Sequence, residues 1–154
     1  MLLAGAIVER LSGLSLRDFQ RQEIFEPLGM SRSSLGLGGR AIEDTVWCGT
    51  ELGRKPGSTD GDDATRYDYT ANSPYWRDQG HPWGGMHSTA PDLACCLRMM
   101  LGGGTYAGRR ILSPASARAM VTDQNSHLAR KPWGIGFGLA GSADWNCTLV
   151  AQCL

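Results

Sequence analysis

Lysine is the residue that most limits the chemistry available to this 154-residue chain. Only Lys55 and Lys131 occur among its 15 lysines and arginines. A serine activated by a lysine one helical turn away requires the pattern Ser-x-x-Lys, because that spacing places both side chains on one helix face. The residues three positions before the two lysines are Leu52 and Leu128. The sequence therefore contains no serine–lysine pair of this kind.

Other compact motifs for catalysis or nucleotide binding are also absent from the sequence. There is no Gly-x-Ser-x-Gly nucleophile elbow, no Gly-x-x-x-x-Gly-Lys phosphate loop and no Gly-x-Gly-x-x-Gly turn. Gly134, Gly136 and Gly138 alternate with large apolar residues, which indicates packing within a strand. We therefore expect no cofactor, and no catalytic residue can be named from a motif.

The sequence has three histidines, His81, His87 and His127, of which His81 and His87 flank the Trp-Gly-Gly loop and could share a metal. No acidic or cysteine residue stands at a helpful spacing from them, and His-Glu-x-x-His is missing, so we expect no metal site. His87 is a candidate substrate-facing group. Its alternative is a loop histidine hydrogen-bonded to the main chain. The acidic run at 58–63 lacks the regular alternation of a calcium loop, and we interpret it as a solvated loop.

The segment at 82–93 combines an aromatic residue, a glycine pair and a helix cap. The glycines permit unusual backbone angles or the close approach of another group. Thr89 can cap the following helix, and Asp92 stands three residues later, where a carboxylate meets unpaired amides. A rigid loop held by a helix is a common way to build one wall of a ligand site.

The composition is that of a globular protein, and it has no excess of charge that would attract an oppositely charged partner. The formal net charge is +0, so we expect no nucleic acid as partner. No segment is long and apolar enough to span a membrane, and the N-terminal residues lack the basic region of a signal peptide. The 5 cysteines show no Cys-x-x-Cys spacing and are interpreted as small buried hydrophobes. The compartment stays open, although these features favour the cytoplasm.

The first part of the chain is predicted to contain two helices. Residues 2–12 are almost continuously apolar and end at Gly13, which predicts a buried helix. Its missing N-cap indicates that sequence is missing upstream. Ser15 caps a second helix with Asp18 in the capping-box position, and the Pro-Leu-Gly-Met at 27–30 breaks it.

The middle of the chain carries weaker signals than the rest. Residues 31–79 are rich in glycine and polar residues, which predicts loops with a short strand near 45–48. An aromatic patch (Tyr67, Tyr69, Tyr75 and Trp76) is interpreted as core or loop anchors.

Four elements are predicted after the Trp-Gly-Gly loop. They are a helix from Thr89 to the glycines at 102–104, a turn or hairpin at 106–112, a helix from Ser113 to about Thr122, and a strand at 133–139.

The order of these segments resembles the serine β-lactamase and penicillin-binding-protein-like hydrolases, in particular their class C β-lactamase-like esterases and peptidases. The resemblance covers roughly residues 2–139 and rests on the segments 5–13, 24–30, 83–94, 111–114 and 133–138. It implies an α/β fold of the α+β type, with an antiparallel sheet flanked by helices, here incomplete. It also implies a partial domain at 1–139 and an unmatched tail at 140–154.

The chemistry that the resemblance implies is acyl transfer through a serine ester. The family uses Ser-x-x-Lys, a Tyr-x-Asn motif, and Lys-Thr-Gly or His-x-Gly on a late strand. None of the three occurs in this sequence, so no catalytic residue is carried over. The resemblance assigns only a substrate-cleft wall, formed by Trp83, Gly84, Gly85, Met86, His87 and Ser88.

We therefore expect an interior fragment of a serine hydrolase that is inactive alone. Completed by missing segments, it would act on a small-molecule ester, β-lactam or peptide amide without a metal. Two alternatives stay open. One is a non-catalytic binding or assembly module that kept the cleft scaffold. The other is a truncated reading frame without function, which the tail after Leu139 favours.

Overall fold

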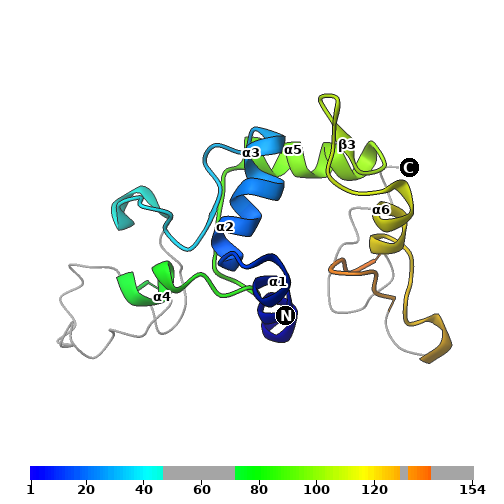
Figure 1. The fold of residues 1–154 in the computed structure, drawn as a ribbon, viewed down its shortest axis with the longest axis horizontal. Coiled ribbons are helices and arrows are strands. Elements are labelled where there is room, and N and C mark those ends of the chain that lie inside the picture. The colour runs from blue at the N-terminus through cyan, green and yellow to red at the C-terminus, as the bar shows by residue number, and fades with distance from the viewer. Residues whose placement is uncertain (47–71, 129–131, 140–154) are drawn as a thin grey trace. The chain divides into compact units, whose positions relative to one another are not determined.

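The computed structural model describes residues 1–46, 72–128 and 132–139 (Figure 1). The chain divides into two compact units, Met1–Cys95 and Cys96–Leu154. Helices dominate both units, and the described strands pair in antiparallel fashion. This combination agrees with the predicted incomplete fold of antiparallel strands and helices. In the described part, no helix is both long and apolar enough to cross a membrane.

The first helix of the first unit, α1 (Leu2–Ser12), ends at Gly13 as predicted. Gly13 has φ 72°, and its N–H donates to the Glu9 carbonyl at 2.9 Å. Glycine reaches this left-handed conformation without the steric cost that a Cβ would impose, so it ends the helix.

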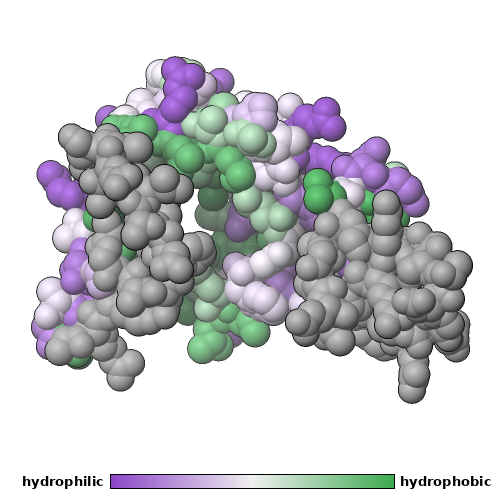
Figure 2. Space-filling model, turned by 180° about the vertical axis from the view of Figure 1, so that it is seen from behind, coloured by the Kyte–Doolittle hydropathy of each residue, from purple (hydrophilic) through white to green (hydrophobic). Residues whose placement is uncertain are grey.

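The predicted burial of α1 is wrong. Leu3 and Leu11 are 81% and 82% exposed, and Gly5 is the buried residue of the helix. Gly5 faces the side chains of Leu16 and Pro82, so the described neighbours cover one side of α1. Figure 2 shows apolar surface gathered over α1 as a result.

A second helical run combines α2 (Leu16–Gln20), the π-helix η1 (Arg21–Phe25) and α3 (Glu26–Leu28). Ser15 Oγ accepts the Asp18 N–H at 3.1 Å, which confirms the predicted cap. Pro27 lies inside α3, and the helical run ends within the predicted break at 27–30. The π-helix directly before it has i→i+5 hydrogen bonds, and this looser turn accommodates a residue without an N–H. The run ends at Gly29, with φ 69°.

The segment predicted as loops contains three short elements: β1 (Ser34–Leu35), the 3-10 helix η2 (Ile42–Asp44) and α4 (Pro74–Gln79). The strand predicted near 45–48 is absent at Thr45 and Val46, and its other residues lie outside the described part. α4 begins at a serine cap, since Ser73 Oγ accepts the Trp76 N–H at 3.2 Å.

The first unit is held together by β1 and its partner β2 (Met86–His87) over a small core. Ser34 pairs with His87, and Leu35 pairs with Met86. The buried apolar side chains of this unit are Phe25, Leu28, Met30 and Leu35. The core therefore sits between the second helical run and β1.

The helix predicted after Thr89 is α5 (Ala90–Leu101), which runs from the first unit into the second. It ends at the predicted glycines, where the Gly102 N–H donates to the Arg98 carbonyl at 2.9 Å. Leu93, Leu97 and Leu101 stand at the helical spacing that predicts this helix, yet all three are exposed, whereas Met99 is buried. The periodicity identified the helix but not the side that packs.

The second unit continues with a β-hairpin, β3 (Thr105–Tyr106) and β4 (Arg109–Arg110), which confirms the predicted hairpin. Ala107 and Gly108 have φ 46° and 77°, the positive angles that favour a tight two-residue hairpin turn. The hairpin is followed by α6 (Pro114–Met120) and the 3-10 helix η4 (Ser126–Leu128).

The strand predicted at 133–139 is wrong for the described residues. Trp133 and Gly138 form an isolated antiparallel bridge, and the Gly134 N–H donates to the Phe137 carbonyl at 2.9 Å. The segment therefore turns back on itself, and Gly136 has φ 84°. The expected close approach at a glycine does occur, because a Cβ on Gly134 would lie 2.7 Å from the Met120 carbonyl carbon.

Candidate functional site

The Trp-Gly-Gly loop is a tight turn that requires glycine at only one of its two glycine positions. The N–H groups of Gly84 and Gly85 both donate to the His81 carbonyl, at 3.2 and 2.8 Å. A Cβ on Gly85 would lie 2.6 Å from the Gly80 carbonyl carbon and closer still to the His81 nitrogen. A Cβ on Gly84 would meet open space. The glycine pair thus has one steric cause, the main chain packed against Gly85.

Main-chain bonds attach the loop to the segment around β1. The Gly36 N–H donates to the Gly85 carbonyl at 2.7 Å, directly beside the β1–β2 pairing. Gly36 has φ 72°, and a Cβ there would lie 2.6 Å from the Asp78 carbonyl oxygen. A side chain at position 36 would therefore collide with the main chain of α4.

A buried carboxylate fixes the other end of the loop. Asp92 is 7% exposed, and its Oδ2 accepts the Arg32 N–H and the Ser33 hydroxyl, both at 2.8 Å. The Thr89 cap is present but long, with 3.5 Å between Thr89 Oγ1 and the Asp92 nitrogen. Asp92 was expected to serve its own helix, yet its carboxylate binds a distant segment. No local pattern around Ser33 signals this contact.

Ser33 and Ser88 form a hydroxyl pair, with their Oγ atoms 2.7 Å apart. Activation of a serine requires a base within hydrogen-bond reach of the hydroxyl. The recorded partners of these two hydroxyls are each other, Asp92 and the Thr89 carbonyl. Both lysines lie outside the described residues. The serines therefore connect the loop to the segment before β1.

His87 makes a contact with the main chain. Its Nε2 lies 3.3 Å from the Arg77 carbonyl oxygen. The Arg77 side chain is itself buried, and its Nη2 donates to Asn72 Oδ1 at 2.5 Å and to the Val46 carbonyl at 2.9 Å. The burial of Arg77 was not predicted from the sequence, because an arginine in a six-residue helix gives no local sign of burial.

Trp83 is the loop residue with the largest side chain on the surface, at 58% exposure. Its ring stacks on His81 with 5.3 Å between centroids and meets Trp76 edge-on at 6.1 Å. Trp76 also contacts His81, at 4.5 Å. An aromatic cluster therefore supports an exposed indole, which is a geometry suited to contact an apolar ligand group.

Metal-ligating residues do not cluster in the part of the chain that the structure describes, where no group of three or more such side chains is found. Cys95 and Cys96 are half-buried, and Tyr75 is 54% exposed. The predictions for the acidic run at 58–63, for Tyr67 and Tyr69, and for the tail at 140–154 fall outside the described residues.

The elements described above are short antiparallel strands and helices, as an incomplete fold of a serine hydrolase-like protein contains. The model of the Beta-lactamase family matches residues 1–148. The chain therefore belongs to the beta-lactamase family. The match continues past Leu139 into the C-terminal tail.

Two curated relatives from Mycobacterium tuberculosis match a shorter stretch. The chain is 47% identical over 64 residues to Protein Rv1367c and to the uncharacterized protein MT1414. The match covers 36% of this chain and 16% of each relative. A crystal structure from Bacteroides dorei DSM 17855, provisionally assigned as a beta-lactamase, matches with a TM-score of 0.48 and 24% identity. That match covers 80% of this chain and 27% of the Bacteroides chain.

Proposed function

We propose that this chain contributes one wall of the substrate cleft of a serine hydrolase and does not form an acyl-serine by itself. The proposal rests on the family match taken together with the residues that precede the two lysines. The family model matches residues 1–148, whereas each of the two lysines has leucine, not serine, three positions earlier. The family's nucleophile and base are thus not supplied by these 154 residues.

The wall itself is the segment from Trp83 to Ser88. Support comes from its attachment at both ends, through the Gly36–Gly85 main-chain bond and the Ser33–Ser88 hydroxyl pair. A wall fixed in this way keeps its shape when substrate binds, which lowers the entropic cost of binding. Trp83 would contact an apolar group of an ester, β-lactam or peptide amide.

Hydrolysis by the 154-residue chain can be measured directly with nitrocefin and a fluorogenic ester. We expect no turnover above the buffer rate. Turnover that a serine-directed covalent inhibitor abolishes would overturn the proposal. If turnover occurs, Ser33→Ala and Ser88→Ala test whether the described hydroxyl pair supplies the nucleophile.

A second candidate is a non-catalytic binding module, and the exposure of Trp83 and Tyr75 favours it. The DNA upstream of the first codon separates the two functions. An in-frame Ser-x-x-Lys followed by Tyr-x-Asn supports the hydrolase, whereas a genuine start at Met1 with its own promoter supports the module.

A further inference from the structure

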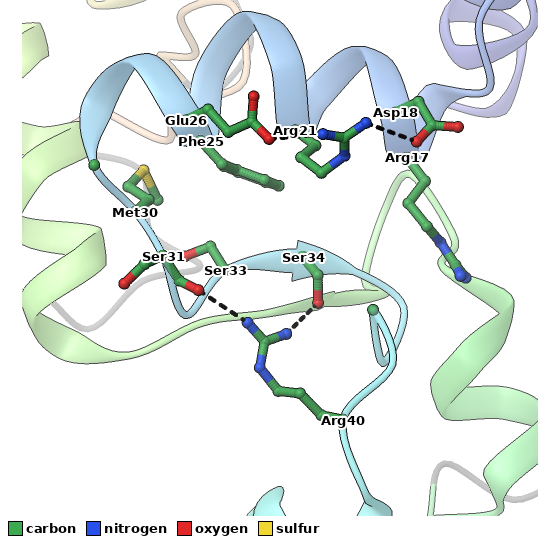
Figure 3. Close-up of a pocket in the computed structure, with 12 residues that line it drawn as sticks. Arg17, Asp18, Arg21, Phe25, Glu26, Met30, Ser31, Ser33, Ser34 and Arg40 are labelled. Atoms are coloured by element: carbon green, nitrogen blue, oxygen red, sulfur yellow. Dashed lines mark hydrogen bonds and ion pairs between the residues drawn. The ribbon is translucent and has the colours of Figure 1, made fainter.

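A pocket of about 650 Å³ lies in the first unit, between the second helical run and the loop after β1 (Figure 3). Its lining includes Phe25 and Met30 on the helical side and Ser31, Ser34 and Arg40 on the loop side. The pocket is separate from the aromatic surface of Trp83, which is not part of its lining.

One wall of the pocket is apolar and rigid. Phe25 and Met30 are 5% and 2% exposed, so both are held by their neighbours. Buried apolar side chains at a pocket wall favour the apolar part of a ligand, because contact with them removes both surfaces from water.

The charges on the helical side of the pocket neutralise one another. Arg21 Nη1 lies 2.6 Å from Glu26 Oε1, and its Nη2 lies 3.3 Å from Asp18 Oδ1. Arg17 pairs with Asp78 at 3.2 Å. Each of these guanidinium groups therefore already has a carboxylate partner.

Arg40 differs, because its partners are neutral oxygen atoms. Its Nη1 donates to Ser34 Oγ at 2.6 Å and to the Leu37 carbonyl at 3.2 Å, and its Nη2 donates to the Ser31 carbonyl at 3.5 Å. Figure 3 shows Arg40 across the pocket from Phe25 and Arg21. Among the described residues, no carboxylate forms an ion pair with Arg40.

The guanidinium of Arg40 has donors left for a ligand. Such a group carries five N–H donors, and three are used in the bonds above. Gly38 stands beside it with φ 60°, and a Cβ there would lie 2.6 Å from the Ser34 Cβ. The glycine therefore lets the loop fold tightly around Ser34, and the three bonds fix the Arg40 head group in one orientation.

We propose that this pocket binds a small monocarboxylate with an apolar body. The carboxylate accepts the remaining N–H donors of Arg40, since a planar guanidinium matches the geometry of a carboxylate. The apolar body lies against Phe25 and Met30. The proposal does not depend on hydrolysis, because none of these residues belongs to the cleft wall.

The test is a titration of the 15N-labelled 154-residue chain, followed by two-dimensional NMR. Hexanoate is the probe, hexanamide removes the charge, acetate removes the apolar body, and inorganic phosphate tests for any anion. We expect hexanoate to shift the amide signals of Ser34, Gly38 and Arg40. Hexanamide and acetate should each bind at least about tenfold more weakly than hexanoate. Hexanamide loses a charged hydrogen bond, and acetate loses most of the apolar contact.

Variants locate the binding. Arg40→Gln should weaken hexanoate binding about tenfold, whereas Arg109→Gln, a change of an exposed arginine in β4, should leave it unchanged. Ser31→Glu keeps the Arg40 side chain and places a competing carboxylate beside it, so it should weaken hexanoate binding as well. This variant serves as the test if Arg40→Gln fails to fold. Equal binding of hexanoate and hexanamide, equal binding of hexanoate and phosphate, or hexanoate shifts that persist in both variants would overturn the proposal.

Discussion

Asp92 Oδ2 accepts the hydroxyl of Ser33 at 2.8 Å, although 59 positions separate the two residues. The same oxygen accepts the Arg32 N–H. This carboxylate therefore joins the start of α5 to the segment that leads into β1. It thereby fixes the C-terminal end of the Trp-Gly-Gly loop, which directly precedes α5. A buried polar contact thus links two segments that are distant in the sequence.

Removal of this carboxylate should destabilise the first unit. Asp92→Ala leaves the Ser33 hydroxyl and the Arg32 N–H without their buried acceptor, so we expect a loss of about 2–3 kcal/mol in the free energy of unfolding. Urea denaturation followed by circular dichroism measures it. Asp44→Asn, in exposed η2, is the control and should change the free energy of unfolding by less than about 0.5 kcal/mol. Equal effects of the two substitutions would contradict the role of Asp92.

The two loop glycines should respond differently to alanine. Gly85→Ala forces a Cβ into the main chain at Gly80 and His81, and we expect it to cost about 2 kcal/mol or more of stability. Gly84→Ala meets open space and should change stability by less than about 1 kcal/mol. Thermal unfolding of both variants is the comparison. A Gly84 variant that is the less stable of the two would refute this turn geometry.

The cap of α2 should make part of the helicity sensitive to acid. The Ser15 hydroxyl, followed by Arg21, lowers the pKa of Asp18 from its ordinary value of 3.8. A lowered folded-state pKa means that this contribution is present above the unfolded pKa and is lost as pH falls through the folded one. Circular dichroism between about pH 6 and pH 2 should therefore show a loss of helicity below about pH 4.

Two substitutions isolate that contribution. Asp18→Asn removes the titrating group, and Ser15→Ala removes the strongest cause of its lowered pKa. Both should flatten the acid-induced change relative to the unaltered chain. An unchanged profile in Asp18→Asn would assign the acid sensitivity to other groups.

The exposed apolar surface of α1 should tolerate charge. Leu11→Glu changes a residue that is 82% exposed, so we expect a stability change within about 0.5 kcal/mol and weaker binding of the dye 8-anilinonaphthalene-1-sulfonate. Leu28→Glu is the contrasting variant, because Leu28 is buried in the core and a charge there should unfold the first unit. Comparable unfolding by both variants would show that α1 packs on its leucine side.

Local signals in the sequence predicted the helix ends well. The Ser15 cap, the Ser113-Pro114 start and the stop at Gly102 were found because each depends on residues a few positions apart. Ser73-Pro74 carries the same kind of start signal and should have predicted α4. The helices were therefore within reach of sequence reasoning.

The packing of the core and the pairing of β1 with β2 could not be predicted from the sequence, unlike the β3–β4 hairpin. β1 has two residues, and its partner β2 lies about fifty positions later, so no periodicity marks it. Alternating glycines at 134–138 fit a strand, but they equally fit a turn that needs a positive φ at Gly136. The apolar run at 2–12 predicted a helix correctly, yet burial depends on which segments cover it.

The most direct test of the proposed function is covalent labelling with a fluorophosphonate, which reacts with activated serines. The full chain is incubated with the probe and measured by intact-mass spectrometry. Because no lysine stands one turn after a serine in this sequence, we predict the unlabelled mass, identical to that of a heat-denatured sample. Stoichiometric labelling of one serine in the folded chain, lost on denaturation, would contradict the account.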